Sequence, residues 1–570
     1  MTFDDIPAGQ TRASTNYALI RTDQYFNTLD IPFTLVFESN QEATNRFPYR
    51  KEMNFTVRLS LEKPNWPLNT GTEAVSSPVV ANLDGTGERL ITLSRNVLHV
   101  VDFNNNSNAG FPLTLPFPAT DTAVGQIAIG DVTGDDRLEI IVLTRIGHVV
   151  VVCPSGAVLY SKELDFVGMS TASPVIADLR GDGTNQIIVA SMRNIYVLNG
   201  NDLSVWNNYP VVHASVGIVG QLAVGDVNND GTKNIVFTTN AQGGASPSIH
   251  ALDPITGQNI SGFPVSGLTL TVMGPSLVNL DDELDLEIVY AGNLTANCPI
   301  TVIKSNGEIL RQTTIPARVT TEIAISDLDR DGVPLLVFGD SAGNLHVMTP
   351  NLQHIQGFPV NVGNAIDSSP VFADVTGNGK RDIIFGDNQG FIHIVDINGK
   401  HLPGYPIRLI NSTLRTSPWV GMFDGGTVLY NTPNGVSSIN LKNPVSHPSW
   451  ARLRGSLGNT ADFNDSKPVS EGNITVPMGI FALQQNFPNP FNPQTTIRFE
   501  VPKEAMVTID IFNIRGQRVK RLINDNLSAG IHQVVWTGHD ENGNTMSSGI
   551  YFYRMQSDSF VETRRMLLIK

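Results

Sequence analysis

The chain has 570 residues, more than a single hydrophobic core usually organises, so we expect two or three domains. It is 41% hydrophobic and only 16% charged, a balance typical of a folded protein rather than a disordered one. The net charge of −15 disfavours binding to nucleic acid or to anionic membranes and favours divalent cations.

Residues 1–62 are expected to form part of a β-sandwich. The runs FTLVFES and MNFTVRLSLE alternate apolar and polar residues, as a strand with one buried face does. The opening MTFDDIPAGQTR has no basic stretch followed by an apolar one, so no secretory signal is visible at Met1. No apolar run approaches the roughly 18 residues of a membrane-spanning helix, and we expect no membrane insertion.

Residues 63–458 contain a repeated phrase, which is an apolar strand, a loop rich in Asp, Asn and Gly, and a second apolar strand. Two examples are IAIGDVTGDDRLEIIVL and LAVGDVNNDGTKNIVFT. The phrase recurs at intervals of 47–53 residues. Its first loop position is held in turn by Asn82, Asp131, Asp178, Asp226, Asn279, Asp327, Asp374 and Met422.

Each repeat continues with a third strand and often with a Gly-aromatic-Pro segment, such as Gly110-Phe111-Pro112. Four short antiparallel strands per repeat are the size of one β-propeller blade, and radial repetition leaves few exposed strand edges. A stacked solenoid is the main competitor, but its repeats usually carry a helix or have a shorter period. The predicted fold class is therefore all-β, with a seven- or eight-bladed propeller. We prefer eight blades, although the eighth copy has lost its acidic loop at Met422.

The ring is expected to close through its two ends. Trp66-Pro67 precedes the first repeat, where the aromatic-Pro of a fourth strand belongs. After the last repeat there is no clear copy of that segment before Trp450. The N-terminal segment is therefore predicted to supply the outer strand of the last blade.

Two further segments follow the repeats. Residues 459–479 are polar, contain Pro and Gly and show little periodicity, which predicts a linker. Residues 480–570 are expected to form an Ig-like β-sandwich. In the run VTIDIF, Val507, Ile509 and Ile511 fall on one face, and Arg515-Gly516 marks a tight turn between strands.

The repeat loops are the best candidates for chemistry, because several place oxygen ligands at the spacing of calcium loops. In the loop that starts at Asp226, such groups fall at positions one, three, five, seven and nine, and Gly231 permits a sharp turn. Hard oxygen ligands at this spacing converge on Ca²⁺. The predicted ligands are Asp226, Asn228, Asp230, Thr232 through its carbonyl, and Asn234.

Three more loops match this pattern to different degrees. Two of them offer four oxygen-bearing side chains each. The third is rich in carboxylates but has Leu335 at position nine. These sets are Asp374, Thr376, Asn378 and Asp382; Asp131, Thr133, Asp135 and Glu139; and Asp327, Asp329 and Asp331. The alternative is ordinary turn chemistry, in which Asx side chains bond their own backbone. If calcium binds, we expect it to stiffen the loops and not to catalyse a reaction.

The remaining loops fit less well. Arg180 stands between Asp178 and Asp182 and disfavours a cation there. Asn82, Asp84 and Glu88 form a weak set, and the series ends at Met422.

No catalytic signature emerges from the sequence. His99, His250, His346 and His393 share one position in the third strand of their repeats, which blade packing explains best. Cys153 and Cys298 are expected to be small buried hydrophobes. There is no G-x-S-x-G elbow, H-E-x-x-H, C-x-x-C or phosphate-binding glycine motif, and the predicted catalytic residues are none.

The repeated phrase resembles the FG-GAP/VCBS repeats of integrin-α-type β-propellers over roughly residues 65–455. That resemblance implies calcium in the repeat loops. Arg180, Leu335 and Met422 depart from the pattern of the family and put their own loops in doubt.

The C-terminus resembles the type A sorting domain of the type IX secretion system. The matching segment begins with NFPNPFNPQTTIRFEVP at Asn486 and runs to Lys570. The resemblance implies recognition by the type IX machinery and a secreted or outer-membrane surface location. Since such cargo needs an N-terminal export signal, and since FDDIPAGQTR resembles the interior of a sandwich module, we expect the chain to belong to a longer protein with residues 1–62 truncated.

The leading hypothesis is a non-catalytic binding and scaffolding propeller, stabilised by calcium, that presents its loops to a protein or glycan. One alternative is the accessory region of a larger secreted hydrolase, such as a protease, whose catalytic domain lies upstream. A third is a propeller lyase or hydrolase with its site in the central channel.

Overall fold

The computed structural model describes residues 28–39, 49–60, 65–462 and 482–569, with short gaps in the last two ranges. The described part contains strands and turns and no α-helix. No helix capable of crossing a membrane is found in it. The all-β prediction is confirmed.

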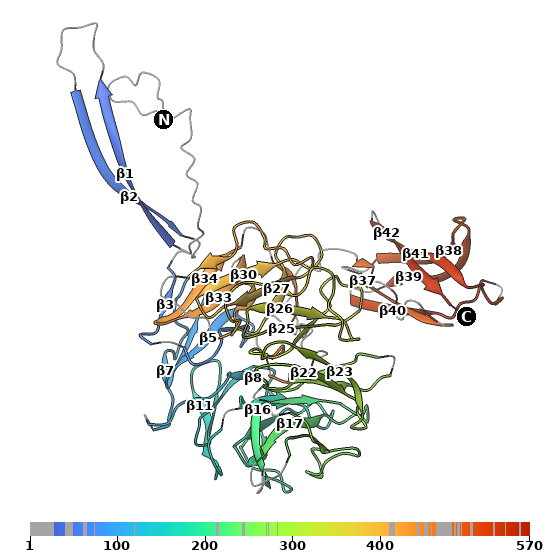
Figure 1. Cartoon of the computed structure of the whole chain (residues 1–570), viewed down its shortest axis with the longest axis horizontal. Coiled ribbons are helices and arrows are strands. Elements are labelled where there is room, and N and C mark those ends of the chain that lie inside the picture. The colour runs from blue at the N-terminus through green and yellow to red at the C-terminus, as the bar shows by residue number, and fades with distance from the viewer. Residues whose placement is uncertain are drawn as a thin grey trace.

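The N-terminal segment contributes one long hairpin (Figure 1). Strand β1 (Thr28–Ser39) pairs antiparallel with β2 (Tyr49–Ser60), from Thr28 opposite Ser60 to Ser39 opposite Tyr49. The rest of residues 1–62 lies outside the described residues, so the truncated β-sandwich stays a prediction.

Eight sheets follow, and each corresponds to one sequence repeat; we number them sheet 1 to sheet 8. The first four comprise β4 (Val79–Ala81), β5 (Arg89–Ser94), β6 (Val97–Val101) and β7 (Leu113–Thr114); β8 (Ala128–Gly130), β9 (Glu139–Leu143), β10 (His148–Val152) and β11 (Val158–Glu163); β12 (Val175–Ala177), β13 (Gln186–Ala190), β14 (Asn194–Asn199) and β15 (Val211–Val212); and β16 (Val216–Gly225), β17 (Asn234–Ala241), β18 (Ser248–Leu252) and β19 (Val265–Ser266).

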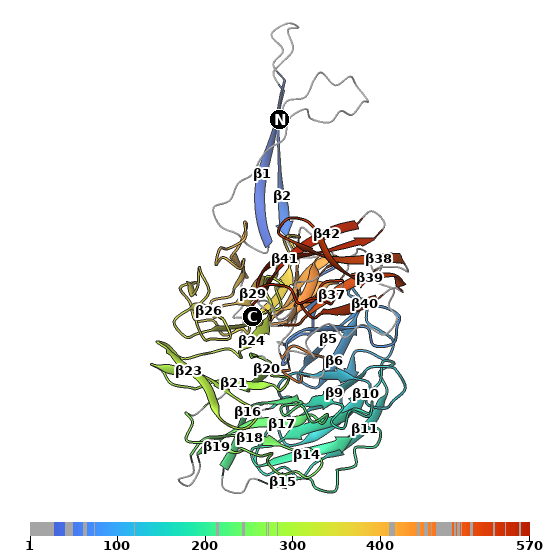
Figure 2. The ribbon, with the colours of Figure 1, turned by 90° about the vertical axis from the view of Figure 1, so that its right-hand side faces the viewer.

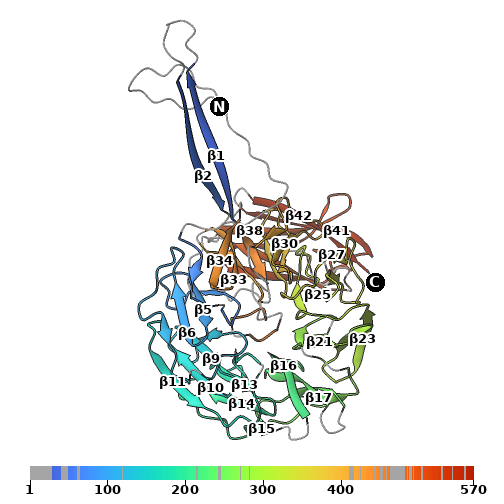
Figure 3. The same cartoon turned by 60° about the vertical axis from the view of Figure 1, so that its left-hand side comes forward.

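The other four comprise β20 (Ser276–Val278), β21 (Glu287–Ala291), β22 (Cys298–Ile303) and β23 (Ile309–Ile315); β24 (Ala324–Ser326), β25 (Leu335–Gly339), β26 (Asn344–Met348) and β27 (Val360–Asn361); β28 (Val371–Asp374), β29 (Asp382–Gly386), β30 (Phe391–Val395) and β31 (Ile407–Arg408), joined by β35 (Ser446–Ser449); and β32 (Trp419–Met422), β33 (Gly426–Thr432) and β34 (Gly435–Asn440), joined by β3 (Leu68–Asn69). Figure 3 shows these sheets around a common centre, as the blades of a β-propeller are arranged.

Sheet 8 contains both ends of the ring. Strand β3 lies at its outer edge, where Leu68 pairs with Val436 and Asn69 with Gly435. Trp66 and Leu68 are buried with Trp419 and Phe423 of the same sheet. The prediction that the N-terminal segment supplies the outer strand of the last sheet is confirmed.

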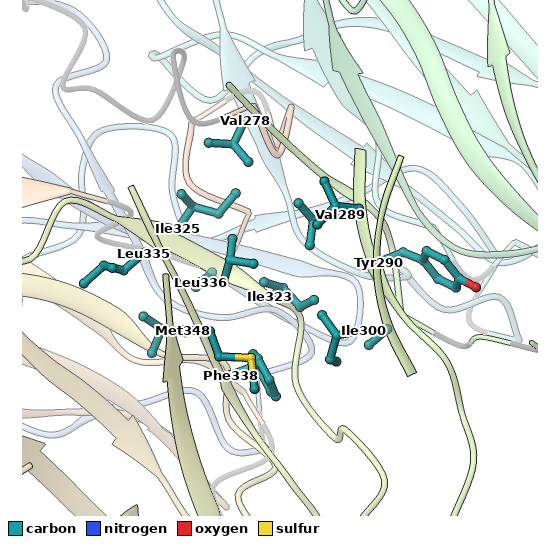
Figure 4. Close-up of a cluster of buried hydrophobic side chains, with 14 of the residues drawn as sticks. Val278, Val289, Tyr290, Ile300, Ile323, Ile325, Leu335, Leu336, Phe338 and Met348 are labelled. Atoms are coloured by element: carbon teal, nitrogen blue, oxygen red, sulfur yellow. The ribbon is translucent and has the colours of Figure 1, made fainter. Parts of the chain in front are cut away.

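The core lies between neighbouring sheets. The middle strands are buried on both faces, which explains their continuous β-branched runs; every residue of β13 and β21 is buried. Between sheets 5 and 6, Val289 and Ile300 pack in one cluster with Ile325 and Leu336 (Figure 4). Cys153 and Cys298 are free thiols and buried, as expected.

The chain re-enters the ring after sheet 8. Strand β35 pairs with β28, the first strand of sheet 7. We call residues 454–462 the channel segment, because its backbone bonds to the first strands of three sheets. Ile129 of β8 donates to the Leu457 carbonyl at 2.9 Å, Val224 of β16 to Thr460 at 2.8 Å, and Leu277 of β20 to Ala461 at 2.9 Å.

The channel segment corrects one predicted boundary. The sequence predicts that the linker begins at residue 459, because this stretch is polar, yet Asn459 is fully buried. Its amide donates to the carbonyls of Ile127 at 3.1 Å and Pro174 at 3.0 Å. These polar groups are buried because they satisfy the free backbone groups of the inner strands.

The C-terminal domain is a sandwich of two sheets (Figure 2). One sheet contains β36 (Ala482–Leu483), β37 (Thr495–Val501) and β40 (Gly530–Trp536), and the other β38 (Ala505–Asn513), β39 (Arg518–Leu527), β41 (Gly549–Ser557) and β42 (Phe560–Leu568). Val507, Ile509 and Ile511 are fully buried between the sheets, and Gly516 occupies the predicted turn with φ at 74°.

Candidate functional site

The predicted metal loops connect the first and second strands of their sheets, and the loop between β8 and β9 gathers its carboxylates best. Ligand atoms of Asp131, Asp135 and Glu139 lie within 4.8 Å of one another. The Asp131 carboxylate also accepts the N–H groups of Gly134 at 2.6 Å and Asp136 at 2.9 Å. The loop is therefore an Asx turn that also brings three acids together.

Glu139 contributes a carboxylate with one oxygen that makes no hydrogen bond within the described part of the chain. The side chain is 1% exposed, and its Oε2 accepts the Val132 N–H at 3.1 Å. Its Oε1 is buried without a hydrogen-bond partner among the described residues. Burial, together with the charges of Asp135 and Asp131, raises the pKa of the Glu139 carboxyl. A buried carboxylate with one unused oxygen fits a cation, and Ca²⁺ held by these three side chains would supply the missing positive charge.

Other groups modify the same loop. The Arg137 guanidinium bonds to the exposed Asp135 carboxylate at 2.5 Å and 3.0 Å, and this hydrogen bonding lowers the pKa of Asp135. Thr133 donates from Oγ1 to Glu139 Oε2 at 3.4 Å, so its hydroxyl lies beside the three carboxylates.

The loop between β24 and β25 also forms a cluster, with ligand atoms of Asp327, Asp329 and Asp331 within 4.8 Å of one another. Burial raises the pKa of Asp331 to about 6 and, in the same direction, that of Asp327. Leu335 is buried in β25 and offers no ligand at position nine, as expected.

The loop that starts at Asp226 is a polar turn in which both oxygens of the Asp226 carboxylate accept backbone N–H groups, as those of Asp131 do. Asp226 accepts the N–H groups of Asp230 at 3.0 Å and Gly231 at 2.9 Å. Asn228 turns its amide N–H toward Asp230 at 2.8 Å, and Thr232 donates its hydroxyl to Asp230 at 2.6 Å. These hydrogen bonds are those of an Asx turn, and calcium binding by this loop stays a prediction.

The loop that starts at Asp374 behaves in the same way. Asp374 accepts the N–H groups of Gly377 at 2.7 Å and Gly379 at 2.8 Å, and Thr376 donates to Asp374 at 3.4 Å. Asn378 accepts the N–H of Lys380 at 2.8 Å. Burial raises the pKa of Asp382, the ninth residue of this loop, to about 6.

The ninth position has a structural role that the metal pattern did not suggest. In five loops its side chain accepts the N–H of the second loop residue, at 2.6–3.1 Å. The acceptors are Glu139, Gln186, Asn234, Glu287 and Asp382. Because carboxylates and amides serve equally, this contact explains the residue types at position nine without an ion.

Sequence reasoning missed one acidic cluster. Ligand atoms of Asp281, Glu283 and Asp285 lie within 4.8 Å of one another in the loop between β20 and β21. Their alternation is visible in the sequence, but it starts two residues after Asn279, the register position. Lys304 lies 3.0 Å from Glu283 and 3.6 Å from Asp281. The chain itself therefore places a cation beside this cluster.

Three of the four histidines that share a position in the third strand stack on a phenylalanine, in agreement with blade packing. His250, His346 and His393 pack on Phe237, Phe338 and Phe385 of the adjacent strands, each with ring centroids 4.8 Å apart. His346 also lies 3.0 Å from Asp340 and 2.9 Å from His354, and His393 has equivalent partners in Asp387 and His401. These hydrogen-bonded chains account for the buried polar atoms of the two rings.

Comparisons with known proteins give one family and a set of distant folds. Residues 489–559 match the family described as the FlgD Ig-like domain, in agreement with the C-terminal sandwich. A search of curated proteins finds no match to the chain.

Three solved structures illustrate the resemblance. BamB from Moraxella catarrhalis is 15% identical with a TM-score of 0.40, over 63% of this chain and 95% of that one. The V. cholerae biofilm matrix protein Bap1 is 11% identical with a TM-score of 0.46, over 69% and 91%. The quinohemoprotein alcohol dehydrogenase ADHIIG from Pseudomonas putida HK5 is 10% identical with a TM-score of 0.44, over 68% and 77%. Likenesses this distant say nothing about the activity or the ligand of the present chain.

Proposed function

We propose that this chain is a non-catalytic binding and scaffolding β-propeller of the cell surface or the extracellular medium. Its repeat loops would be stiffened by calcium and would bind a protein or glycan ligand. Residues 480–570 would direct export through the type IX secretion machinery.

The channel segment is the observation that carries the binding role. The inner strands of a propeller converge on its centre, where a substrate site would be built from several blades. Here Arg454, Asn459 and Ala461 are fully buried at that place. Gly225 of β16 leaves room for the segment, since a Cβ there would lie 2.7 Å from Asp462. This supports a function on the outer loops, and loops on a rigid scaffold commonly carry binding.

The calcium role rests on the loop that contains Glu139. Three carboxylates approach one another there, and one buried oxygen has no partner within the described part of the chain. An ion at this position would join the two strands that the loop connects, and so would stabilise the sheet without taking part in a reaction.

Export is the part of the proposal that a single experiment tests. The full chain and a chain ending at residue 479 would each be expressed with an added signal peptide in a bacterium with type IX secretion. We expect the full chain on the cell surface or in the medium and the shorter chain in the periplasm. A strain without the type IX machinery is the control. Equal export of both chains would overturn the proposed role of residues 480–570.

A further inference from the structure

We propose a binding pocket for acidic sugars at the outer edge between sheets 3 and 4. The cavity has a volume of about 510 Å³. Its lining combines one indole ring, one guanidinium group and several amides and hydroxyls, from Arg180, Asn199, Ser204, Trp206, Asn207 and Asn208. The inference rests on the proposed binding function and gives it a ligand class and a location.

The pocket opens where sheet 3 carries Asn208 in place of a glycine that several other repeats share. Gly110, Gly262 and Gly357 precede the aromatic-Pro of their repeats and touch the turn of the next sheet. An added Cβ would lie 2.1, 1.8 and 2.3 Å from a carbonyl oxygen of that turn. Asn208 has the same place in sheet 3, before Tyr209-Pro210. A side chain therefore stands where these three repeats pack backbone against backbone.

The Asn208 side chain lies between its own backbone and the turn of the neighbouring sheet. Its Nδ2 donates to the carbonyl oxygen of Ile255, in the turn between β18 and β19, at 2.6 Å. Because of this side chain, the turn cannot come as close to the backbone of sheet 3 as the equivalent turns come to Gly110, Gly262 and Gly357. Space therefore remains between sheets 3 and 4. Ile255 is 42% exposed at the rim of that space.

Trp206 provides a fixed aromatic surface. In the four repeats with a Gly-aromatic-Pro segment, its position is held by Asn108, Ile260, Ile355 and Leu402. The indole Nε1 donates to Asn199 Oδ1 at 2.7 Å, which fixes the orientation of the ring. Fixed aromatic rings beside amide groups suit pyranose rings, whose C–H faces are apolar and whose edges carry hydroxyls.

Arg180 supplies the charge that selects the ligand. Its guanidinium carbon lies 4.3 Å from the centre of the Trp206 ring. In other loops the equivalent third position carries an oxygen ligand such as Asn228 or Asp329, so this loop has a cation in place of a metal-binding group. A guanidinium on an aromatic face pairs bidentately with carboxylates. The combination favours a uronic acid over a neutral sugar.

Calorimetry on the full chain with trigalacturonic acid, and with the neutral galactotriose as matched probe, tests the pocket. We expect the acidic trimer to bind roughly tenfold or more tightly than the neutral one, since bonds to charged groups are stronger. Arg180→Gln should remove this preference, and Trp206→Ala should abolish binding of both. Arg318→Gln, an exposed arginine in a different sheet, should change neither.

A further variant keeps the test valid if Trp206→Ala unfolds. Asn208→Gly restores the glycine of the other repeats and should reduce binding of both trimers while the melting temperature is maintained. No binding of the acidic trimer at millimolar concentration, or binding unchanged by Arg180→Gln and Asn208→Gly, would overturn the pocket. Attachment of the Asn208→Gly chain to its cell surface or to another ligand would leave the general binding function standing.

Discussion

Arg454 and Glu322 form a buried ion pair, with Arg454 Nη1 3.0 Å from Glu322 Oε2. Arg454 begins the channel segment, and Glu322 precedes β24 in sheet 6, 132 residues earlier in the chain. The same guanidinium donates to the carbonyl of Leu222 in β16. One side chain therefore links the returning chain to two separate sheets, and Gly274 leaves room for it, since a Cβ there would lie 2.7 Å from Arg454.

Removing Arg454 should lower the stability of the ring. In Arg454→Met the Glu322 charge stays buried without its partner, and we expect the free energy of unfolding to fall by about 3–5 kcal/mol. Urea unfolding followed by tryptophan fluorescence measures this. The double variant Arg454→Met/Glu322→Leu should recover part of the loss, and Arg318→Met is the surface control. A change below about 0.5 kcal/mol in Arg454→Met would contradict the structural role of the pair.

Glu287 should make the ion-free protein less stable at neutral and higher pH. Its side chain is fully buried, and burial raises the pKa of the carboxyl from 4.5 to about 7. Because the folded state holds this proton more tightly than the unfolded state, the free energy of unfolding falls as the pH rises through that interval. Glu287→Gln should remove the loss and stabilise the protein at pH 8 by about 1–3 kcal/mol, because a shift of one pKa unit corresponds to about 1.4 kcal/mol.

Gln186 makes the corresponding contact in sheet 3, where it accepts the Leu179 N–H at 2.9 Å. An amide is therefore compatible with this position. Urea unfolding at pH 4.5 and pH 8 should give a difference between Glu287→Gln and the parent only at the higher pH. Equal destabilisation of the variant at both values would show that geometry, and not charge, dominates.

Calcium should stabilise the protein through the loop that contains Glu139. At a free calcium concentration one hundred times the dissociation constant, we expect the chelator-treated protein to gain about 2.7 kcal/mol. Glu139→Gln keeps an acceptor for the Val132 N–H but loses the charge, so it should lose most of this gain. Asp182→Asn, in the loop that contains Arg180, should lose none. A melting temperature that is the same with EDTA and with calcium would rule out the site.

Gly435 should be required for the closure of the ring. It has φ at 151°, and a Cβ there would lie 2.0 Å from the carbonyl oxygen of Leu68. We expect Gly435→Ala to lower the free energy of unfolding by about 1–3 kcal/mol. Gly425→Ala is the matched control, since Gly425 also has a positive φ, at 96°, but no atom within 4 Å of the added carbon. Equal effects of the two variants would indicate backbone strain alone, without a role for the contact with β3.

The sequence predicted those features that repeat. The register of Asp131, Asp226 and Asp374 located the loops, and the shared position of His250 and His346 predicted their packing. The outer strand at Leu68 could be predicted because Trp66-Pro67 repeats an aromatic-Pro pattern. In each case the same local environment recurs in several sheets, so the amino-acid pattern recurs with it.

Features formed once in the chain could not be predicted in this way. Asn459 and Thr460 look like linker residues, because the backbone groups that they satisfy lie hundreds of residues away. Lys304 lies in a later turn of the same sheet than Glu283. Among the described residues their contact occurs in one repeat only, so the sequence shows no recurring pattern for it. The pattern of oxygen ligands also could not show that Asn228 turns its N–H toward Asp230, since an amide can present either end.

Closure by β3 has a consequence for the length of chain that can fold. The backbone N–H of Thr70 donates to Asn434 at 2.8 Å, across 364 residues of sequence. A chain that stops before residue 435 lacks β34, the strand that pairs with β3, so sheet 8 cannot close the ring. The apolar faces of sheets 1 and 7 that pack against sheet 8 would then be exposed. Exposed apolar surface of this kind promotes association, so a truncated product is expected to aggregate, whereas a chain that reaches β34 buries both faces.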